Sequence, residues 1–371
     1  MKINWLGVVL VALMAGNVQA QTSQPPPVIH SWTIGADVAP GGMVKLKGIG
    51  QSVGSIRSGQ GEKSLDIPQT NDPFVGVHFG LKPSKGMGFE VRYMGFGGHG
   101  DSAGSVAQTD GTLMLWGAND TPHIVSTAPK LDGAVGYTLQ SSVKFSRIDF
   151  LGNYNFTGPR GWLSAFGGVP ILRIEATEGV TRSQGFLLYA RLPNGTLDTR
   201  GIREDYAYSS SATSKARLFG LTGGVEGEYC LVSSLIVHGR VALAIFPWGS
   251  AEMAGRFTAD KDIYLVNVSG GLTAAPTQTL AHLKLPGANY EASVKQTVKA
   301  FDGTIGLKWR IKGKSASLDI GGAITGLSLS NLPTGPSYAI SDGFAPGNGK
   351  FAPRAGRISM MAPMMTIGVW F

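Results

Sequence analysis

The chain alternates apolar and polar residues at period two in ten separate stretches, and the last of these stretches runs to the final residue. In "MMTIGVWF", Met365, Ile367, Val369 and Phe371 alternate with the residues between them, and nothing polar follows. A period of two with β-branched and aromatic residues predicts a β-strand. The last residues of a soluble domain are usually frayed and polar. A strand that ends the chain on Phe371 therefore favours an apolar solvent.

The first twenty residues, "MKINWLGVVLVALMAGNVQA", have the layout of a cleaved signal peptide. Lys2 precedes a short apolar run, and Ala20 stands at the expected cleavage point. The run is shorter than the roughly 20 apolar residues that a transmembrane helix needs. We therefore expect an exported protein with a signal peptide over residues 1–20, an extended leader over 21–31 and a single barrel domain over 32–371.

The composition narrows the fold class. Charged residues make up 15% of the chain, against about 25% in typical soluble domains, and glycine is abundant with 54 residues. Beyond the signal peptide no apolar run is long enough for a membrane helix, and hydrophobic residues are spread thinly along alternating segments. A transmembrane β-barrel has this composition, because each strand meets lipid only at every second residue. The lone Cys230 excludes an internal disulfide framework.

The alternating stretches form hairpins around short turns, with one single strand at each end. They predict strands over residues 32–38, 74–81, 87–96, 144–156, 161–175, 216–231, 235–248, 298–311, 315–328 and 357–371. Between the hairpins lie five segments of roughly 30 to 50 residues, which are far longer than ordinary connections. Long outer loops and short periplasmic turns are typical of outer-membrane barrels. We predict an all-β, antiparallel, up-and-down transmembrane barrel of about ten strands, with long extracellular loops and both termini in the periplasm.

Each predicted strand has an apolar face and a polar face. In the stretch 144–156, for example, Ile148 and Phe150 share one face, while Arg147 and Asp149 share the other. The apolar faces are expected to meet lipid and the polar faces to line the lumen. The charged residues expected in the lumen are Glu90, Arg92, Arg147, Asp149, Glu226, Glu228, Arg240, Asp302, Lys308, Arg310 and Asp319.

The closing strand resembles the C-terminal assembly signal of Gram-negative outer-membrane proteins. The residues that carry this resemblance are Ile367, Gly368, Val369 and Phe371, although Thr366 stands where such signals often have glycine. The resemblance implies recognition by the barrel-assembly machinery and residence in the outer membrane after Sec-type export. The hairpins "DFLGNYNFTGPRGWLSAFGGV" and "GGVEGEYCLVSSLIVHGRVAL" are similar to those of the Legionella-type major outer-membrane, pore-forming family. That similarity implies a porin-like role.

Two functions stay open from the sequence. Ten strands lie near the limit at which side chains fill a barrel, so a pore would be narrow and charged, for passive passage of small solutes or ions. The alternative is a structural or surface-interaction barrel, like an adhesin, whose extracellular loops bind a partner and which has no open pore. An enzyme is not expected. His99 and Asp101 in "GGHGDS" lie just beyond a strand, as in outer-membrane proteases, but no second acidic pair completes such a site.

The basic charge has two interpretations, lipid phosphates as partners or simple solubility of the loops. The net charge is +8, and Lys215 and Arg217 stand where a long loop meets its strand. Basic side chains at that level would attract phosphate groups of outer-membrane lipid and lipopolysaccharide. Export argues against a nucleic-acid partner. The six histidines are scattered without ligand spacing, and no phosphate-binding glycine loop is present, so no metal site or cofactor is expected.

Overall fold

The fold is seen in a computed structural model that describes most of the chain from residue 32 onward. The described residues are 32–47, 52–58, 61–66, 69–83, 85–108, 113–117, 132–191, 197–232, 234–267, 269, 275–340 and 349–371. The predicted signal peptide and the whole of the predicted leader lie outside them. Within the described part of the chain, no helix has the length and hydropathy needed to cross a membrane.

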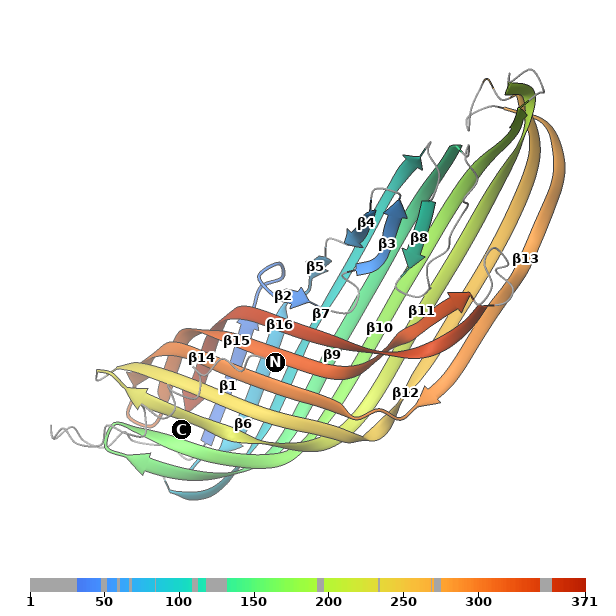
Figure 1. Cartoon of the computed structure of the whole chain (residues 1–371). Helices are drawn as coiled ribbons and strands as arrows, with labels where there is room; N and C mark the ends of the chain where they lie inside the picture. Colours follow the sequence, from blue (N-terminus) through green and yellow to red (C-terminus); the bar gives the residue numbers. More distant parts are fainter. Residues whose placement is uncertain are drawn as a thin grey trace.

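Ten strands form a closed antiparallel barrel, in which each strand pairs with its neighbours along the chain (Figure 1). The predicted number of barrel strands is thus confirmed. The barrel strands are β1 (Trp32–Ala39), β6 (Phe74–Leu81), β7 (Gly86–Gln108), β9 (Asp132–Gly158), β10 (Gly161–Arg191), β11 (Leu197–Cys230), β12 (Leu235–Asn267), β14 (Val298–Lys312), β15 (Ser317–Ile340) and β16 (Gly349–Trp370).

The remaining strands lie outside this closed path. One pairs with β12 and two short ones pair with β16 and β7, while three others form a small separate sheet in which β3 is central. This small sheet lies against β9 and β10. These strands are β2 (Lys45–Lys47), β3 (Ser52–Ser58), β4 (Gly61–Asp66), β5 (Gln69–Asn71), β8 (Leu113–Gly117) and β13 (Pro276–Val294).

The barrel closes where the two ends of the described chain meet. β16 runs antiparallel to β1, and the backbone N–H of Trp32 donates to the carbonyl oxygen of Phe371 at 2.9 Å. The N–H of Phe371 returns a bond of 3.0 Å to the carbonyl oxygen of Trp32. Closure pairs the backbone groups of both outer strands, which a sheet in hydrocarbon requires. The end of the barrel that holds both termini and the four short turns is called the turn end below.

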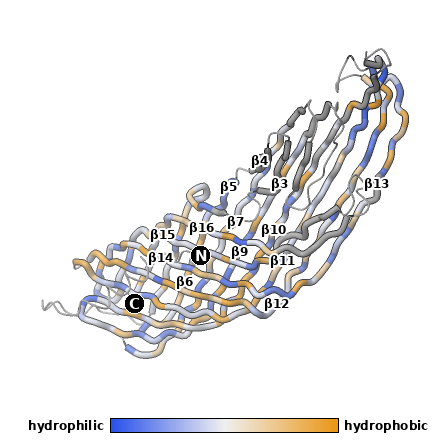
Figure 2. The backbone as a smooth tube through the Cα atoms, viewed as in Figure 1, coloured by the Kyte–Doolittle hydropathy of each residue, from blue (hydrophilic) through white to orange (hydrophobic). Residues whose placement is uncertain are grey.

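An apolar belt surrounds the barrel above the turn end. On β14 the side chains from Phe301 to Ile311 that point outward are each about half exposed, and their neighbours point inward. The alternation of hydrophobic and hydrophilic residues along the barrel strands is visible in Figure 2. Ten residue steps extend about 33 Å, which a strand tilt of about 40° reduces to about 25 Å, the height of a lipid-facing band. The belt therefore fits the hydrocarbon core of a bilayer.

The strands of the middle hairpins continue far beyond the belt. β10, β11 and β12 contain 31, 34 and 33 residues, while a tilted strand crosses a membrane with about 9 to 11. With β7, β9 and β13 they form a long curved sheet that rises from one side of the barrel (Figure 1). The segments between the hairpins were predicted to be loops, and this prediction is wrong for much of their length. Runs such as "YSSSATSK" are rich in serine, but paired neighbours on both sides keep them extended.

A β-bulge marks the point where β12 leaves the belt. Phe219 pairs with Trp248 and Leu221 with Ile245, so that two residues of β12 lie opposite one residue of β11. Pro247 is one of the two, and a bulge tolerates its missing N–H. Two residues later Gly249 has a φ of 118°, which only glycine adopts readily. The bulge re-aims β12 as it enters the extended sheet.

A charge in the apolar belt should destabilise the inserted barrel. Ile305 lies near mid-height of the belt on the outward face of β14. We expect Ile305→Lys to lower the free energy of unfolding by about 2–4 kcal/mol. Ser211→Lys lies on the same outer face but beyond the belt, so it should change this energy by about 0.5 kcal/mol or less. Urea titration of the two variants refolded in liposomes measures both values. Equal losses would contradict the placement of the belt.

Loss of the last three residues should prevent insertion. Deleting residues 369–371 removes the pairs of β1 with Val369 and Trp370 and the two backbone bonds at Phe371. Export should be unaffected, while the truncated chain should be periplasmic, aggregated or degraded. Fractionation and heat-modifiable migration on a cold gel report the outcome, and Phe371→Tyr is the control that keeps the strand complete. A truncated chain that accumulates as a folded, soluble monomer would refute the barrel.

Candidate functional site

A dense layer of charged side chains occupies the barrel interior toward the turn end. It brings together all eleven charged residues that the sequence placed in the lumen, and it adds Asp37 and Lys82. We call this set the charged layer. Its six basic members are Lys82, Arg92, Arg147, Arg240, Lys308 and Arg310, and its seven acidic members are Asp37, Glu90, Asp149, Glu226, Glu228, Asp302 and Asp319. The layer is therefore nearly neutral.

Arg147 is the most deeply buried member of the charged layer. Its Nε donates to Asp149 at 2.6 Å, and its Nη1 donates across the lumen to Asp302 of β14 at 2.8 Å. Nη2 donates to the hydroxyl oxygen of Thr222 at 3.2 Å. β9 and β14 are not neighbours in the barrel, so the bond to Asp302 joins two facing parts of the wall. The guanidinium thus bridges the lumen and does not line an open passage.

A second group of ion pairs links the first turn to β11 and β12. Lys82 Nζ lies 2.6 Å from Glu90 and 2.5 Å from Glu226. Arg240 reaches Glu226 at 3.4 Å and Asp302 at 3.8 Å. Because Asp302 also binds Arg147, the two groups form one continuous network across the barrel. Buried charges are tolerated when they are paired in this way.

A third group closes the turn end. Arg310 donates to Asp319 at 2.7 Å and to Glu228 at 2.8 Å, and Lys308 lies 2.7 Å from Asp319 and also contacts Glu228. The indole N–H of Trp370 donates to Asp319 at 2.9 Å. Both Lys308 and Arg310 stack over the Trp370 ring. The residue before the chain end therefore fills the mouth of the barrel at this end.

Three members of this site were missed in the sequence. Lys82 was taken as a turn residue, although it continues the inward parity of His78 and Gly80 on β6. Asp37 and Trp370 also point inward, because alternate residues of a strand face opposite sides and their neighbours on β1 and β16 face outward. Counting every second residue through the strand ends would have found all three.

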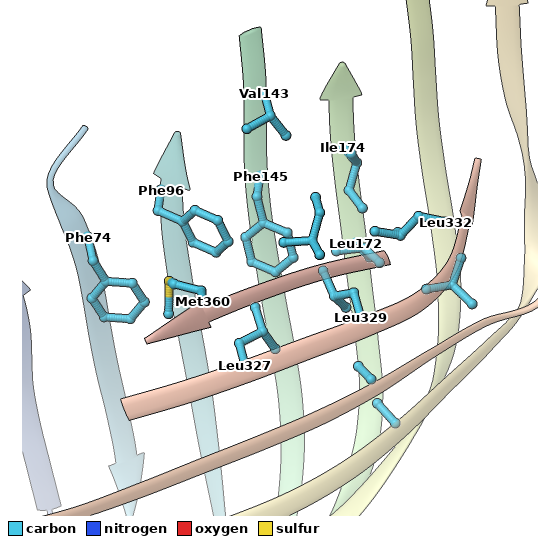
Figure 3. Close-up of a cluster of buried hydrophobic side chains, with 14 of the residues drawn as sticks. Phe74, Phe96, Val143, Phe145, Leu172, Ile174, Leu327, Leu329, Leu332 and Met360 are labelled. Atoms are coloured by element: carbon cyan, nitrogen blue, oxygen red, sulfur yellow. The ribbon is translucent and has the colours of Figure 1, made fainter. Parts of the chain in front are cut away.

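Above the charged layer the interior is apolar. One cluster of buried hydrophobic side chains receives at least one residue from each of the ten barrel strands. Phe96 of β7 and Phe145 of β9 stack in it with ring centroids 4.6 Å apart. We call this cluster the apolar layer, and Figure 3 shows how its side chains point toward one another from facing strands. Its main members are Ala39, Phe74, Phe96, Phe145, Leu172, Leu218, Phe246, Val298, Leu329 and Ile358.

The apolar layer corrects the prediction of a polar lumen, which holds only for the charged layer. In "LRIE", Leu172 and Ile174 are buried inside while Arg173 and Glu175 are exposed outside. The polarity of the two faces is therefore reversed relative to the belt. The reversal begins where β10 leaves the lipid, because the outer face there meets water and the inner face packs against other strands.

β15 also touches a strand that is not its neighbour. The hydroxyl of Ser214 on β11 donates to the carbonyl oxygen of Pro333 at 2.9 Å, and both residues are buried. Ala212 and Ala216 flank Ser214 on the same inner face of β11. Small side chains allow the two walls to approach, so the barrel is flattened against β11 at this level.

The far part of the extended sheet carries a second polar cluster. Lys261 lies 2.9 Å from Glu204, and the hydroxyl of Tyr206 donates to Glu204 at 2.8 Å. Burial, together with Glu204, raises the pKa of Tyr206. On the opposite face Arg203 pairs with Asp205 at 3.0 Å, and burial raises the pKa of that carboxyl group. The ion pair of Lys261 with Glu204 joins β12 to β11, while the other two contacts lie within β11.

Among the described residues two exposed histidines contact an aspartate, His99 with Asp72 and His282 with Asp262. His99 lies 3.7 Å from Asp72 and both are exposed, while Asp101 points the same way one pair further along β7. In the described ranges no group of three or more histidine, cysteine, aspartate or glutamate side chains is placed to hold a metal ion. What the interior can do chemically is to exclude water and hold the walls together.

No protein-family profile and no curated protein sequence matches this chain, so the similarity to the Legionella-type family stays a prediction. Among solved structures, the outer membrane protease OmpT from Escherichia coli is 14% identical and has a TM-score of 0.34, with 94% of this chain and 98% of that chain covered. A FadL homologue from Pseudomonas aeruginosa is 7% identical with a TM-score of 0.24, covering 92% and 90%. The fold assignment rests on the strand pairing described above.

Removing the Arg147 side-chain charge should be costly. Arg147→Met leaves Asp149 and Asp302 buried without their shared partner, and breaking a buried ion pair typically costs about 3–5 kcal/mol. The exposed pair of Lys215 and Glu175, 3.4 Å apart, supplies the matched control. We expect Lys215→Met to cost about 1 kcal/mol or less. Urea unfolding in liposomes measures both, and similar losses would contradict a desolvated charged layer.

Proposed function

We propose that this protein is a sealed outer-membrane barrel of a Gram-negative bacterium that anchors the extended sheet at the cell surface, where the sheet makes contacts with other molecules. This is the surface-interaction function, not the porin-like one. In this proposal the extended sheet outside the membrane makes the functional contacts. The barrel then acts as the anchor.

The observation that carries this proposal is the apolar layer. Every barrel strand contributes at least one buried side chain to it, which supports a filled cross-section. A hydrophobic constriction excludes ions and water even where some space remains between side chains. Solutes that entered from the turn end would first meet the charged layer, whose basic and acidic groups are paired with each other and not directed at an open lumen. Two consecutive filled layers support a sealed barrel.

Closure of the barrel and the apolar belt support this location. A closed barrel with an apolar belt can reside in a bilayer, because no backbone edge is left in hydrocarbon. Short turns and both termini lie on the periplasmic side of such barrels, which directs the extended sheet outward. We infer that the barrel-assembly machinery recognises the closing strand through Ile367, Gly368, Val369 and Phe371. Two of these residues, Ile367 and Phe371, present exposed apolar side chains on the outer face.

The extended sheet has the features of a surface for protein contacts. It contains roughly half of the residues of the longest strands, and it offers β13 as an edge strand that pairs only with β12 among the described residues. A free edge can accept an extended segment of a partner. Such a long sheet would serve no purpose in a simple pore, because a channel needs only the strand length that spans the bilayer.

Conductance separates this function from the second candidate, a narrow pore. The charged layer is the feature that favours a pore, since polar lumens conduct ions in wider barrels. We expect the refolded wild-type protein to give no steady conductance steps in planar bilayers, while a general porin inserted under the same conditions conducts. Insertion is checked by heat-modifiable migration of the same sample. Regular, reproducible steps from the inserted wild type would overturn the sealed barrel and establish the pore.

A further inference from the structure

Two rows of residues cross the outer face just above the apolar belt, and they differ in their charge pattern. Four adjacent strands, β9 to β12, contribute one residue each to every row. The upper row, further from the belt, consists of Lys144, Glu175, Lys215 and Glu252. The lower row, next to the belt, consists of Ser146, Arg173, Arg217 and Ser250.

The upper row neutralises itself. Its charges alternate in sign from strand to strand, and Lys215 lies 3.4 Å from Glu175. Opposite charges directly across a strand pair stabilise a sheet. No further ligand is needed there.

The lower row does not neutralise itself. Arg173 and Arg217 are directly opposite each other, both are exposed, and their other neighbours in the row are serines. Like charges at this spacing, about 5 Å between Cβ atoms, destabilise a strand pair. Among the described residues neither arginine has an acidic partner within ion-pair distance. In the upper row, by contrast, Lys215 is paired with Glu175. The arginine pair is therefore suited to an anionic ligand.

The height of the arginine pair indicates which anion it meets. The row directly below it consists of Ile148, Ile171, Phe219 and Trp248, which belong to the belt. The Arg217 guanidinium stacks over the Phe219 ring at 5.6 Å, so it stays close to the lipid boundary. An aromatic ring beneath and water above place the pair at the level of lipid head groups. Arginine is the residue that best binds phosphate through two parallel hydrogen bonds.

We propose that Arg173 and Arg217 together bind a phosphate group on the head group of an outer-leaflet lipid, for which lipopolysaccharide is the source. The inference rests on the proposed location in the outer membrane, because only there does the extended end face that leaflet. One phosphate between two guanidinium groups converts a repulsive strand pair into a bridged one. The lipid then holds β10 and β11 together where they leave the membrane.

The test compares two double variants that each remove two positive charges from the strands β9 to β11. Arg173→Gln with Arg217→Gln removes the lower pair, and Lys144→Gln with Lys215→Gln removes the bases of the upper row. Wild type and both variants are refolded in detergent, where heat-modifiable migration establishes that each is folded. Binding is then measured for phosphorylated lipid A, for the same lipid with its phosphates removed, and for inorganic phosphate.

Wild type should bind phosphorylated lipid A at least about tenfold more tightly than the dephosphorylated lipid, as expected for charge-assisted bonds. The arginine variant should lose this preference, and the lysine variant should keep it within about threefold. An arginine variant that keeps the preference, or a lysine variant that loses it equally, would overturn the site. Inorganic phosphate binding as tightly as the lipid would overturn the lipid source. The conductance result does not enter this assay, so failure of the sealed barrel and failure of the lipid site are seen separately.

Discussion

The hydrogen bonding of the backbone at the seam between β1 and β16 is the constraint on which the rest of the structure depends. In hydrocarbon an unpaired N–H or carbonyl group costs several kcal/mol, so a sheet must close on itself or stay out of the bilayer. The mutual bonds of Trp32 and Phe371 complete this closure at the turn end. The inside and outside of every other strand are then fixed by alternation. The position of each charged side chain in the interior follows from this geometry.

The filled interior follows from the size of the barrel. Ten strands leave little more room than the eight at which side chains fill the lumen. Toward the turn end the space is taken by ion pairs, which require accurate geometry because each charge has lost its water. Toward the extended end it is taken by Phe, Leu and Ile side chains, which gain from burial directly. Wall-to-wall bonds such as that of Arg147 with Asp302 make the two halves of the barrel wall one rigid body.

Most of the barrel strands and their lipid-facing sides could be predicted from the sequence, and particular residues show why. Alternation in "DGTIGLKWRI" gives both the strand β14 and its lipid face, because the membrane imposes strict polarity on every second residue. Above the membrane that rule ends. Serine and threonine in "YSSSATSK" suggest a loop in isolation, and only pairing with β10 and β12 makes them strand. The apolar layer was missed for a related reason. Leu172 and Ile174 lie on the inward face of β10, where a polar lumen was predicted, but they pack against apolar side chains of other strands.

The bulge at Pro247 affects the direction in which the long upper part of β12 leaves the barrel. Beyond Gly249 the strand β12 continues to Asn267, a distance of about 60 Å along an extended chain. A difference of about 10° in strand direction at the bulge therefore corresponds to about 10 Å at the far end. The geometry of this one bulge therefore affects where the far end of β12 lies relative to the barrel. A sheet of this reach places its far end well clear of the apolar belt, at a level that the short strands β1 and β6 do not approach.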